Sequence, residues 1–141
     1  MKKFTFLLLP LFFLFVAGGC SDGRKPTYPV KGKILVDGQP AFEAFIWFHP
    51  VDKNDPMRVV PFAQADEQGN FNLNSYITGD GSPTGDFIIT FEWPRRSGTF
   101  KTQFEGPDRL KDKYKNIEGS KFKVSIDKQG KDLGTFELTA N

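Results

Sequence analysis

The sequence predicts an all-β domain, a β-sandwich of about seven short strands, behind an N-terminal export signal. Three observations lead to this prediction. Apolar and polar residues alternate with the period of two that strands have. Glycine, proline, asparagine and aspartate gather between these alternating runs, where turns need them. Beyond the N-terminal apolar stretch, no run keeps the 3.6-residue period of a helix.

The first twenty residues have the order of an export signal that ends in a cysteine. Lys2 and Lys3 precede the apolar run Phe4–Val16, and three small residues then lead to Cys20. Pro10 interrupts the run, which is shorter than the roughly 20 residues needed to span a bilayer. The sequence therefore predicts a signal peptide over residues 1–19, cut before a cysteine that carries lipid.

The cleavage site resembles the lipobox of bacterial lipoproteins, with Ala17 at a position where leucine is most common. Such a cysteine carries several acyl chains, and each buried methylene contributes about 0.8 kcal/mol, so the anchor is stable. We expect an exported, membrane-anchored lipoprotein of the cell envelope, on the periplasmic face or the cell surface. Residues 20–29 are expected to form the lipidated cysteine and its tether, and residues 28–141 the sandwich.

Charge and cysteine content exclude several classes of function. Once Lys2 and Lys3 leave with the signal, 17 basic residues balance 17 acidic residues. A neutral domain argues against a nucleic-acid partner, because phosphate contacts select basic surfaces. Cys20 is the sole cysteine, so with lipid attached no thiol is left for a disulfide, a zinc site or a nucleophile.

The first predicted strand covers Val30–Val36 and ends at Asp37-Gly38, a dipeptide typical of hairpin turns. Ala44–His49 follows, closed by a proline. Val59–Ala65 is the third strand, and its Pro61 indicates an edge position because proline cannot donate to the ladder.

The second half of the chain continues the same pattern, and its clearest strand places alternate aromatic and apolar side chains on one face. In chain order, the expected elements are a turn at Asp66–Asn70 into Phe71–Leu73, a loop at Gly79–Gly85, a strand at Asp86–Trp93, an irregular segment at Pro94–Asn116, and strands at Lys121–Asp127 and Leu133–Leu138.

Four segments in this order resemble the carboxypeptidase regulatory-like, or transthyretin-like, domain found in many bacterial lipoproteins. They are Val30 to Pro40, Ala44 to Pro50, Ala65 to Phe71 and Pro83 to Ile89. The resemblance implies a seven-stranded, prealbumin-like Greek-key sandwich. It implies little about function, since most such lipoproteins have no assigned activity.

No metal or cofactor is expected. Carboxylates that could contribute to a calcium site do not have the spacing of an established calcium loop, and turn chemistry accounts for Asp66 and Asn70. The glycine-rich loop Gly79–Gly85 lacks the Gly-Lys-Ser/Thr of a phosphate cradle.

An enzyme is the least expected class. His49 is the only histidine, and nothing in the sequence locates an acid and a nucleophile around it. Hydroxyisourate hydrolase, the enzyme on a transthyretin-like scaffold, uses several histidines and a C-terminal Tyr-Arg-Gly-Ser, whereas this chain ends Leu138-Thr139-Ala140-Asn141.

Aromatic residues provide the candidate binding surface. In the second strand Ile46 and Phe48 share one face, so Phe45 and Trp47 share the other with His49. We expect the segment 94–116, which carries two phenylalanines, to cover that second face. The alternative is an exposed platform of Phe45 and Trp47, with Trp93, for a partner or a glycan.

The resulting functional prediction is a non-catalytic, lipid-anchored envelope module with a structural or protein-interaction role. The alternative is a module that binds carbohydrate or another small ligand. Its partners would be the membrane, through the lipid, and an envelope protein or a glycan that the sequence does not identify.

Overall fold

The computed structural model describes residues 23–97 and 104–141, and within them the chain forms strands and turns but no helix. The prediction of an all-β domain is confirmed. The strands are β1 (Val30–Val36), β2 (Gln39–Pro40), β3 (Phe45–Pro50), β4 (Phe62–Gln64), β5 (Asn70–Asn72), β6 (Gly85–Glu92), β7 (Pro94–Ser97), β8 (Phe104–Asp108), β9 (Lys123–Ile126) and β10 (Lys131–Leu138).

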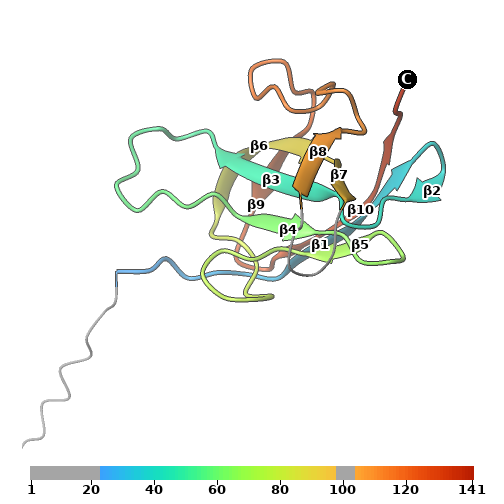
Figure 1. Ribbon diagram of the computed structural model, residues 1–141. Helices are drawn as coiled ribbons and strands as arrows, with labels where there is room; N and C mark the ends of the chain where they lie inside the picture. The colour runs from blue at the N-terminus through green and yellow to red at the C-terminus, as the bar shows by residue number, and fades with distance from the viewer. Residues whose placement is uncertain (1–22, 98–103) are drawn as a thin grey trace, which may run out of the picture.

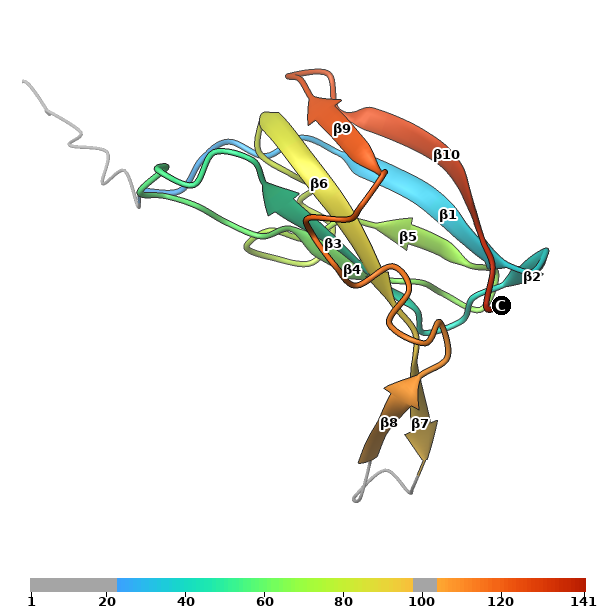
Figure 2. The same cartoon turned by 90° about the horizontal axis from the view of Figure 1, so that it is seen from above.

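Two sheets form a sandwich-like domain. One has the order β10-β1-β2, with β5 also paired to β1, and the other has the order β4-β3-β6-β9. Figure 1 and Figure 2 show the two sheets as separate layers, with the β7–β8 ribbon projecting from the end of β6 away from both. The last strand of the chain lies parallel to the first, an arrangement that the alternation pattern alone does not indicate.

Strand β1 shows why the alternating runs become strands. Val30, Ile34 and Val36 are buried against the second sheet, while Lys31 is exposed. Asp37 and Gly38 follow with φ values of 50° and 77°, the left-handed pair that a tight hairpin between right-twisted strands requires. The predicted turn is confirmed, and it leads directly into β2.

Strands β3 and β6 lie at the centre of the second sheet and pair from Phe45↔Glu92 to Pro50↔Phe87. Strand β4 pairs with the other side of β3 and forms the edge of the sheet. Its position confirms the inference from Pro61, because a residue that cannot donate a ladder hydrogen bond is tolerated at an edge.

Most aromatic side chains of the described residues serve the core. Phe91 is fully buried, and its ring centroid lies 5.2 Å from that of Phe122 and 5.1 Å from that of Phe136. Phe48 and Phe87 form a second pair at 5.8 Å. The Phe91–Phe136 contact joins β6 of one sheet to β10 of the other, and all three pairs have the edge-to-face or tilted geometries that aromatic quadrupoles favour.

The expectation of an irregular segment over Pro94–Asn116 is wrong in part. Residues 94–97 and 104–108 within it pair as the antiparallel ribbon β7–β8, with Ser97 opposite Phe104, and the portion after residue 108 forms turns. Alternation is weak in these strands because the ribbon projects from the two sheets (Figure 2) and none of its described side chains belongs to the core cluster.

Candidate functional site

Strand β3 carries the candidate site on the outer face of the second sheet. Ile46 and Phe48 are fully buried in the core, as the alternation predicts, so Phe45 and Trp47 point outward. Both outward rings are half-buried. The strand therefore has an aromatic outer side in addition to its core side.

Three rings lie together on that face, and we call Phe45, Trp47 and Phe62 the outer aromatic row. The centroids of Phe45 and Trp47 are 6.0 Å apart with planes inclined by 23°, and those of Trp47 and Phe62 are 5.1 Å apart with planes inclined by 24°. Phe62 comes from edge strand β4, where it pairs with Trp47 in the register, and it is exposed. Sequence reasoning missed Phe62, although the alternation of Phe62 and Gln64 with buried Ala63 and Ala65 could have found it.

The β7–β8 ribbon reaches one end of the row. The Arg96 guanidinium lies 5.6 Å from the Phe45 ring centroid and 3.5 Å from a Glu43 carboxylate oxygen. This cation–π contact and ion pair hold the base of β7 over Phe45. Phe100, one of the residues expected to cover the row, lies outside the described residues, so the choice between a covered face and an exposed platform stays a prediction.

Trp47 carries an unusual polar group. Its indole Nε1 is buried and has no hydrogen-bond acceptor within the part of the chain that the structure describes. A buried donor without an acceptor costs about 1–3 kcal/mol, so native structures have few of them. The row therefore contains one donor whose hydrogen-bonding capacity is unused.

His49 continues the outer side of β3 beyond Trp47. Its Nε2 lies 2.8 Å from the Thr90 hydroxyl oxygen, and Thr90 is buried. Burial lowers the pKa of His49 below 6.5, the nearby Arg58 adds to that effect, and Glu92 opposes it. The imidazole is therefore biased towards its neutral form, in which one ring nitrogen donates and the other accepts.

A cavity of about 510 Å³ opens beside His49 on the same side of the domain. Ile88 contributes an apolar wall, and Lys53, Arg58, Lys115 and Glu118 are among the charged residues that line it. Three cations against one anion give this cavity a positive character. The aromatic row and this cavity, which has apolar walls and charged residues in its lining, together offer the two kinds of surface that fix a small ligand.

Trp93 does not join the outer aromatic row. It follows β6, packs against the core cluster, and donates its indole N–H to the Phe42 carbonyl at 2.8 Å. The Arg109 guanidinium lies 4.8 Å from its ring centroid. Of the three residues predicted as a platform, the structure brings Phe45 and Trp47 together and places Trp93 elsewhere.

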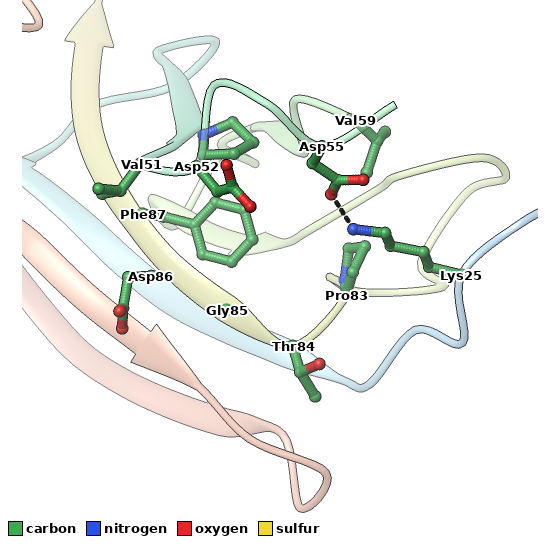
Figure 3. Close-up of a pocket in the computed structure, with 11 residues that line it drawn as sticks. Lys25, Val51, Asp52, Asp55, Val59, Pro83, Thr84, Gly85, Asp86 and Phe87 are labelled. Carbon is green, nitrogen blue, oxygen red and sulfur yellow. Dashed lines mark hydrogen bonds and ion pairs between the residues drawn. The ribbon is translucent and has the colours of Figure 1, made fainter. Parts of the chain in front are cut away.

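A second cavity, of about 360 Å³, lies where the N-terminal segment meets the loops after β3 and before β6. Figure 3 shows the Lys25 ammonium meeting the Asp55 carboxylate on one side of it, with Asp86 on the other side and the Phe87 ring between. Asp86 accepts a hydrogen bond from the Ser125 hydroxyl. Each of the charged groups here thus has a partner within the domain, Asp52 through the backbone N–H of Asn54.

The carboxylates of Asp66 and Asp80 hold turns of the backbone and do not form a calcium site. Asp66 accepts the backbone N–H groups of Gln68 and Asn70 at 2.9 and 2.8 Å. Asp80 accepts three backbone N–H groups of the loop before it. Within residues 23–97 and 104–141, no group of three or more potential ligands is placed to hold a metal ion.

Cys20 lies outside the described residues, so its lipidation stays a prediction. The part of the chain that follows it in the structure contains no helix long and apolar enough to cross a bilayer.

Comparisons with known proteins show a distant structural similarity. No family model matches the chain, and a search of curated proteins finds no match. A 9R-lipoxygenase from Cyanothece PCC8801 aligns over 80% of this chain with 12% identity and a TM-score of 0.43, and the chain spans only 16% of that protein. A candidate carbohydrate-binding protein from Pseudomonas aeruginosa aligns over 82% of this chain and 90% of its own, with 14% identity and a TM-score of 0.42. The chain is thus an all-β, sandwich-like domain that distantly matches these two structures.

Proposed function

We propose that this chain is a lipid-anchored, non-catalytic module of the cell envelope that binds glycans on its outer aromatic row. The observation that carries the proposal is the row itself, three neighbouring rings on the outer face of a rigid sheet. Aromatic rings bury the apolar C–H faces of sugars while polar neighbours bind the hydroxyl groups.

The surroundings of the row support a polar ligand. The cavity beside His49 supplies hydrogen-bond donors and acceptors within the same face, and its excess of cations suits a glycan that bears carboxylates. The unpartnered Trp47 Nε1 is a further donor that a small shift of the neighbouring rings would expose to a sugar oxygen.

A protein partner is the second candidate, and the exposure of Phe62 on an edge strand favours it. Edge strands bind other chains by adding a strand. Here, however, the outer side of β4 is already bonded at Phe62, which exchanges two backbone hydrogen bonds of 3.0 and 2.9 Å with Asn74. Strand addition at β4 would have to displace this bridge, so we place the glycan first.

The proposal also states that the module is non-catalytic. His49, the sole histidine of the chain, is bonded to the Thr90 hydroxyl and not to a carboxylate that could orient it as a base. We also propose that the sandwich is of the Greek-key, transthyretin-like kind, on the strength of the four sequence segments described above.

Glycan binding can be tested on the full-length protein in detergent micelles, with an array of neutral and acidic oligosaccharides. Phe62→Ala removes an exposed ring of the row and leaves the core untouched. We expect it to weaken binding about tenfold, which corresponds to about 1.4 kcal/mol. Phe42→Ala is the matched control, because Phe42 is also exposed but lies outside the row.

If the wild-type protein binds no glycan on the array, the proposal is wrong. If wild type and Phe62→Ala bind equally well, the outer aromatic row is not the binding site. Binding of acidic but not neutral glycans would add the cationic cavity to the site.

A further inference from the structure

The N-terminal segment is fastened to one pole of the sandwich. The Lys25 backbone N–H donates to the Tyr76 hydroxyl at 3.1 Å, and its ammonium pairs with Asp55. Tyr28 and Ser82 exchange two backbone hydrogen bonds of 2.8 and 2.9 Å. The segment is therefore held between the loop at 51–61 and the loop at 74–82, and Figures 1 and 2 both show these two loops at the end of the domain where the segment enters.

This attachment shortens the free tether. Two residues lie between Cys20 and Gly23, so three Cα–Cα steps join them, and an extended chain spans at most about 3.6 Å per step. Whatever their conformation, these residues span about 11 Å at most. A lipid on Cys20 therefore brings the pole that holds the N-terminal segment close to the bilayer surface.

Exposed apolar side chains are concentrated at the same pole. Val51 and Met57 are 50% and 48% exposed on one of the two loops, and Ile77 is 65% exposed on the other. Ile77 is the most exposed large apolar side chain among the described residues. Isolated exposed apolar residues are ordinary, but three on the two loops that grip the tether form a group.

The charges of the two loops do not oppose a membrane. Asp55 is paired with Lys25, the Asp80 carboxylate accepts three backbone N–H groups, and the exposed Asp52 accepts the backbone N–H of Asn54, so each of the three acidic groups has a partner within the domain. Lys53 and Arg58 are exposed on the loop at 51–61. Cations flanking apolar side chains suit the headgroup region of an anionic bilayer.

We infer that Val51, Met57 and Ile77 form a membrane-contact surface that inserts into the interface of an anionic phospholipid bilayer. The inference rests on the lipid anchor of the proposed function and not on its outer aromatic row, although Val51, Lys53 and Arg58 also line the cavity beside His49. The two loops lie with their apolar tips at the level of the headgroups, about 5–10 Å deep, as interfacial elements do. The domain is thereby held in one orientation instead of turning freely on a flexible tether.

The test uses the mature, acylated protein that begins at Cys20, in vesicles of phosphatidylethanolamine and phosphatidylglycerol. Met57→Cys and Ile77→Cys each introduce one free thiol, since acylation blocks the amine and sulfur of Cys20, and each thiol is labelled with a polarity-sensitive fluorophore. Phe42→Cys is the matched control, because Phe42 is 48% exposed like Met57 but lies on the β2–β3 connection at the other end of β3. Phospholipids brominated on their acyl chains serve as the quencher.

In vesicles, we expect the emission of the fluorophores at positions 57 and 77 to shift to shorter wavelength and to be quenched by the brominated lipids. The fluorophore at position 42 should show neither the shift nor the quenching. Equal quenching at all three positions, or none at 57 and 77, would overturn the inference. A mature protein without acyl chains would also overturn the inference, because no lipid on Cys20 would then hold this pole within about 11 Å of the bilayer. None of these results depends on whether the outer aromatic row binds a glycan.

Discussion

His49 Nε2 lies 2.8 Å from the Thr90 hydroxyl oxygen, across the pairing of β3 and β6. Thr90 is the outward residue beside Trp47 and is nevertheless buried, so its hydroxyl needs a protein partner. A neutral imidazole can either donate to or accept from that hydroxyl, whereas an imidazolium can only donate. The contact thus links the protonation of His49 to the stability of the sheet.

Stability should fall as His49 becomes protonated. Burial lowers its pKa below the unfolded value of 6.5, with Arg58 acting in the same direction and Glu92 against it. The unfolded state therefore binds the proton at higher pH than the folded state, so the contribution of His49 is complete above pH 6.5 and is lost as the pH falls below that value. Urea unfolding between about pH 8 and pH 5 measures this dependence. In His49→Gln the free energy of unfolding should depend less steeply on pH in that window. An equally steep dependence would mean that other groups cause it.

Trp47→Ala should lower the free energy of unfolding by about 2 kcal/mol, less than the 3–5 kcal/mol of a fully buried tryptophan. The ring contacts both Phe45 and Phe62 but is only half-buried. Thermal or urea unfolding measures the loss, with Phe42→Ala as a surface control within about 0.5 kcal/mol of wild type. If Trp47→Ala melts like wild type, the row contributes to binding alone.

Trp47→Phe should be tolerated far better than Trp47→Ala. Phenylalanine keeps an aromatic ring beside Phe45 and Phe62 and removes the buried Nε1 donor, whose desolvation costs about 1–3 kcal/mol. We expect a stability within about 1 kcal/mol of wild type, since the lost ring area and the lost penalty offset each other. A loss as large as that of Trp47→Ala would mean that Nε1 has an acceptor in the folded protein.

Gly81→Ala should destabilise the domain more than Gly79→Ala does. Both glycines have left-handed φ values, +87° and +75°. A Cβ at Gly79 would meet nothing within 4 Å, whereas one at Gly81 would lie 1.8 Å from the Tyr28 carbonyl oxygen. Gly79→Ala should therefore cost only backbone strain, about 1–2 kcal/mol. Gly81→Ala should cost a further 1–3 kcal/mol or so, because the two hydrogen bonds between Tyr28 and Ser82 must break.

The measurement for this pair is urea unfolding together with limited proteolysis of the N-terminal segment. Gly81→Ala should release the segment and make it cleavable by trypsin after Arg24, since Pro26 blocks cleavage after Lys25. Equal stability and equal cleavage in the two variants would show that the segment is not held by the Tyr28–Ser82 bridge.

Cys20→Ser should abolish metabolic labelling of the protein with fatty acid and leave the precursor uncleaved, because signal removal in this pathway follows acylation of the cysteine. Labelling and the mass of the mature chain measure this. Membrane attachment and mass that match those of wild type would contradict lipidation at Cys20.

The strands could be predicted wherever one face is buried against a sheet. In β6 the alternation of Phe87, Ile89 and Phe91 with more polar residues is a direct consequence of one face lying in the core. The β7–β8 ribbon is not predictable for the converse reason, because its strands project from the two sheets (Figure 2) and none of their described side chains belongs to the core cluster.

The candidate site was only half predictable. Alternation in β3 places Phe45 and Trp47 on one outward face, but alternation along one strand says nothing about which neighbour lies beside it. Phe62 joins them because β4 pairs with β3 in a particular register, with Trp47 opposite Phe62. Trp93 was grouped with them by residue type, and it packs instead against the core cluster.

The sequence by itself determined the class of this protein, because the period of the apolar residues and the turn residues between them are local properties of the chain. It also determined that Ile46 and Phe48 share one face and Phe45 and Trp47 the other, since successive side chains of a strand point to opposite sides, and the structure buries the face of Ile46 and Phe48. Only the tertiary structure decided that β10 lies beside β1, that Phe62 lies beside Trp47, and that Lys25 joins two loops at one pole. These are contacts between segments distant in sequence, and they depend on the order and register of the strands, which no local pattern specifies.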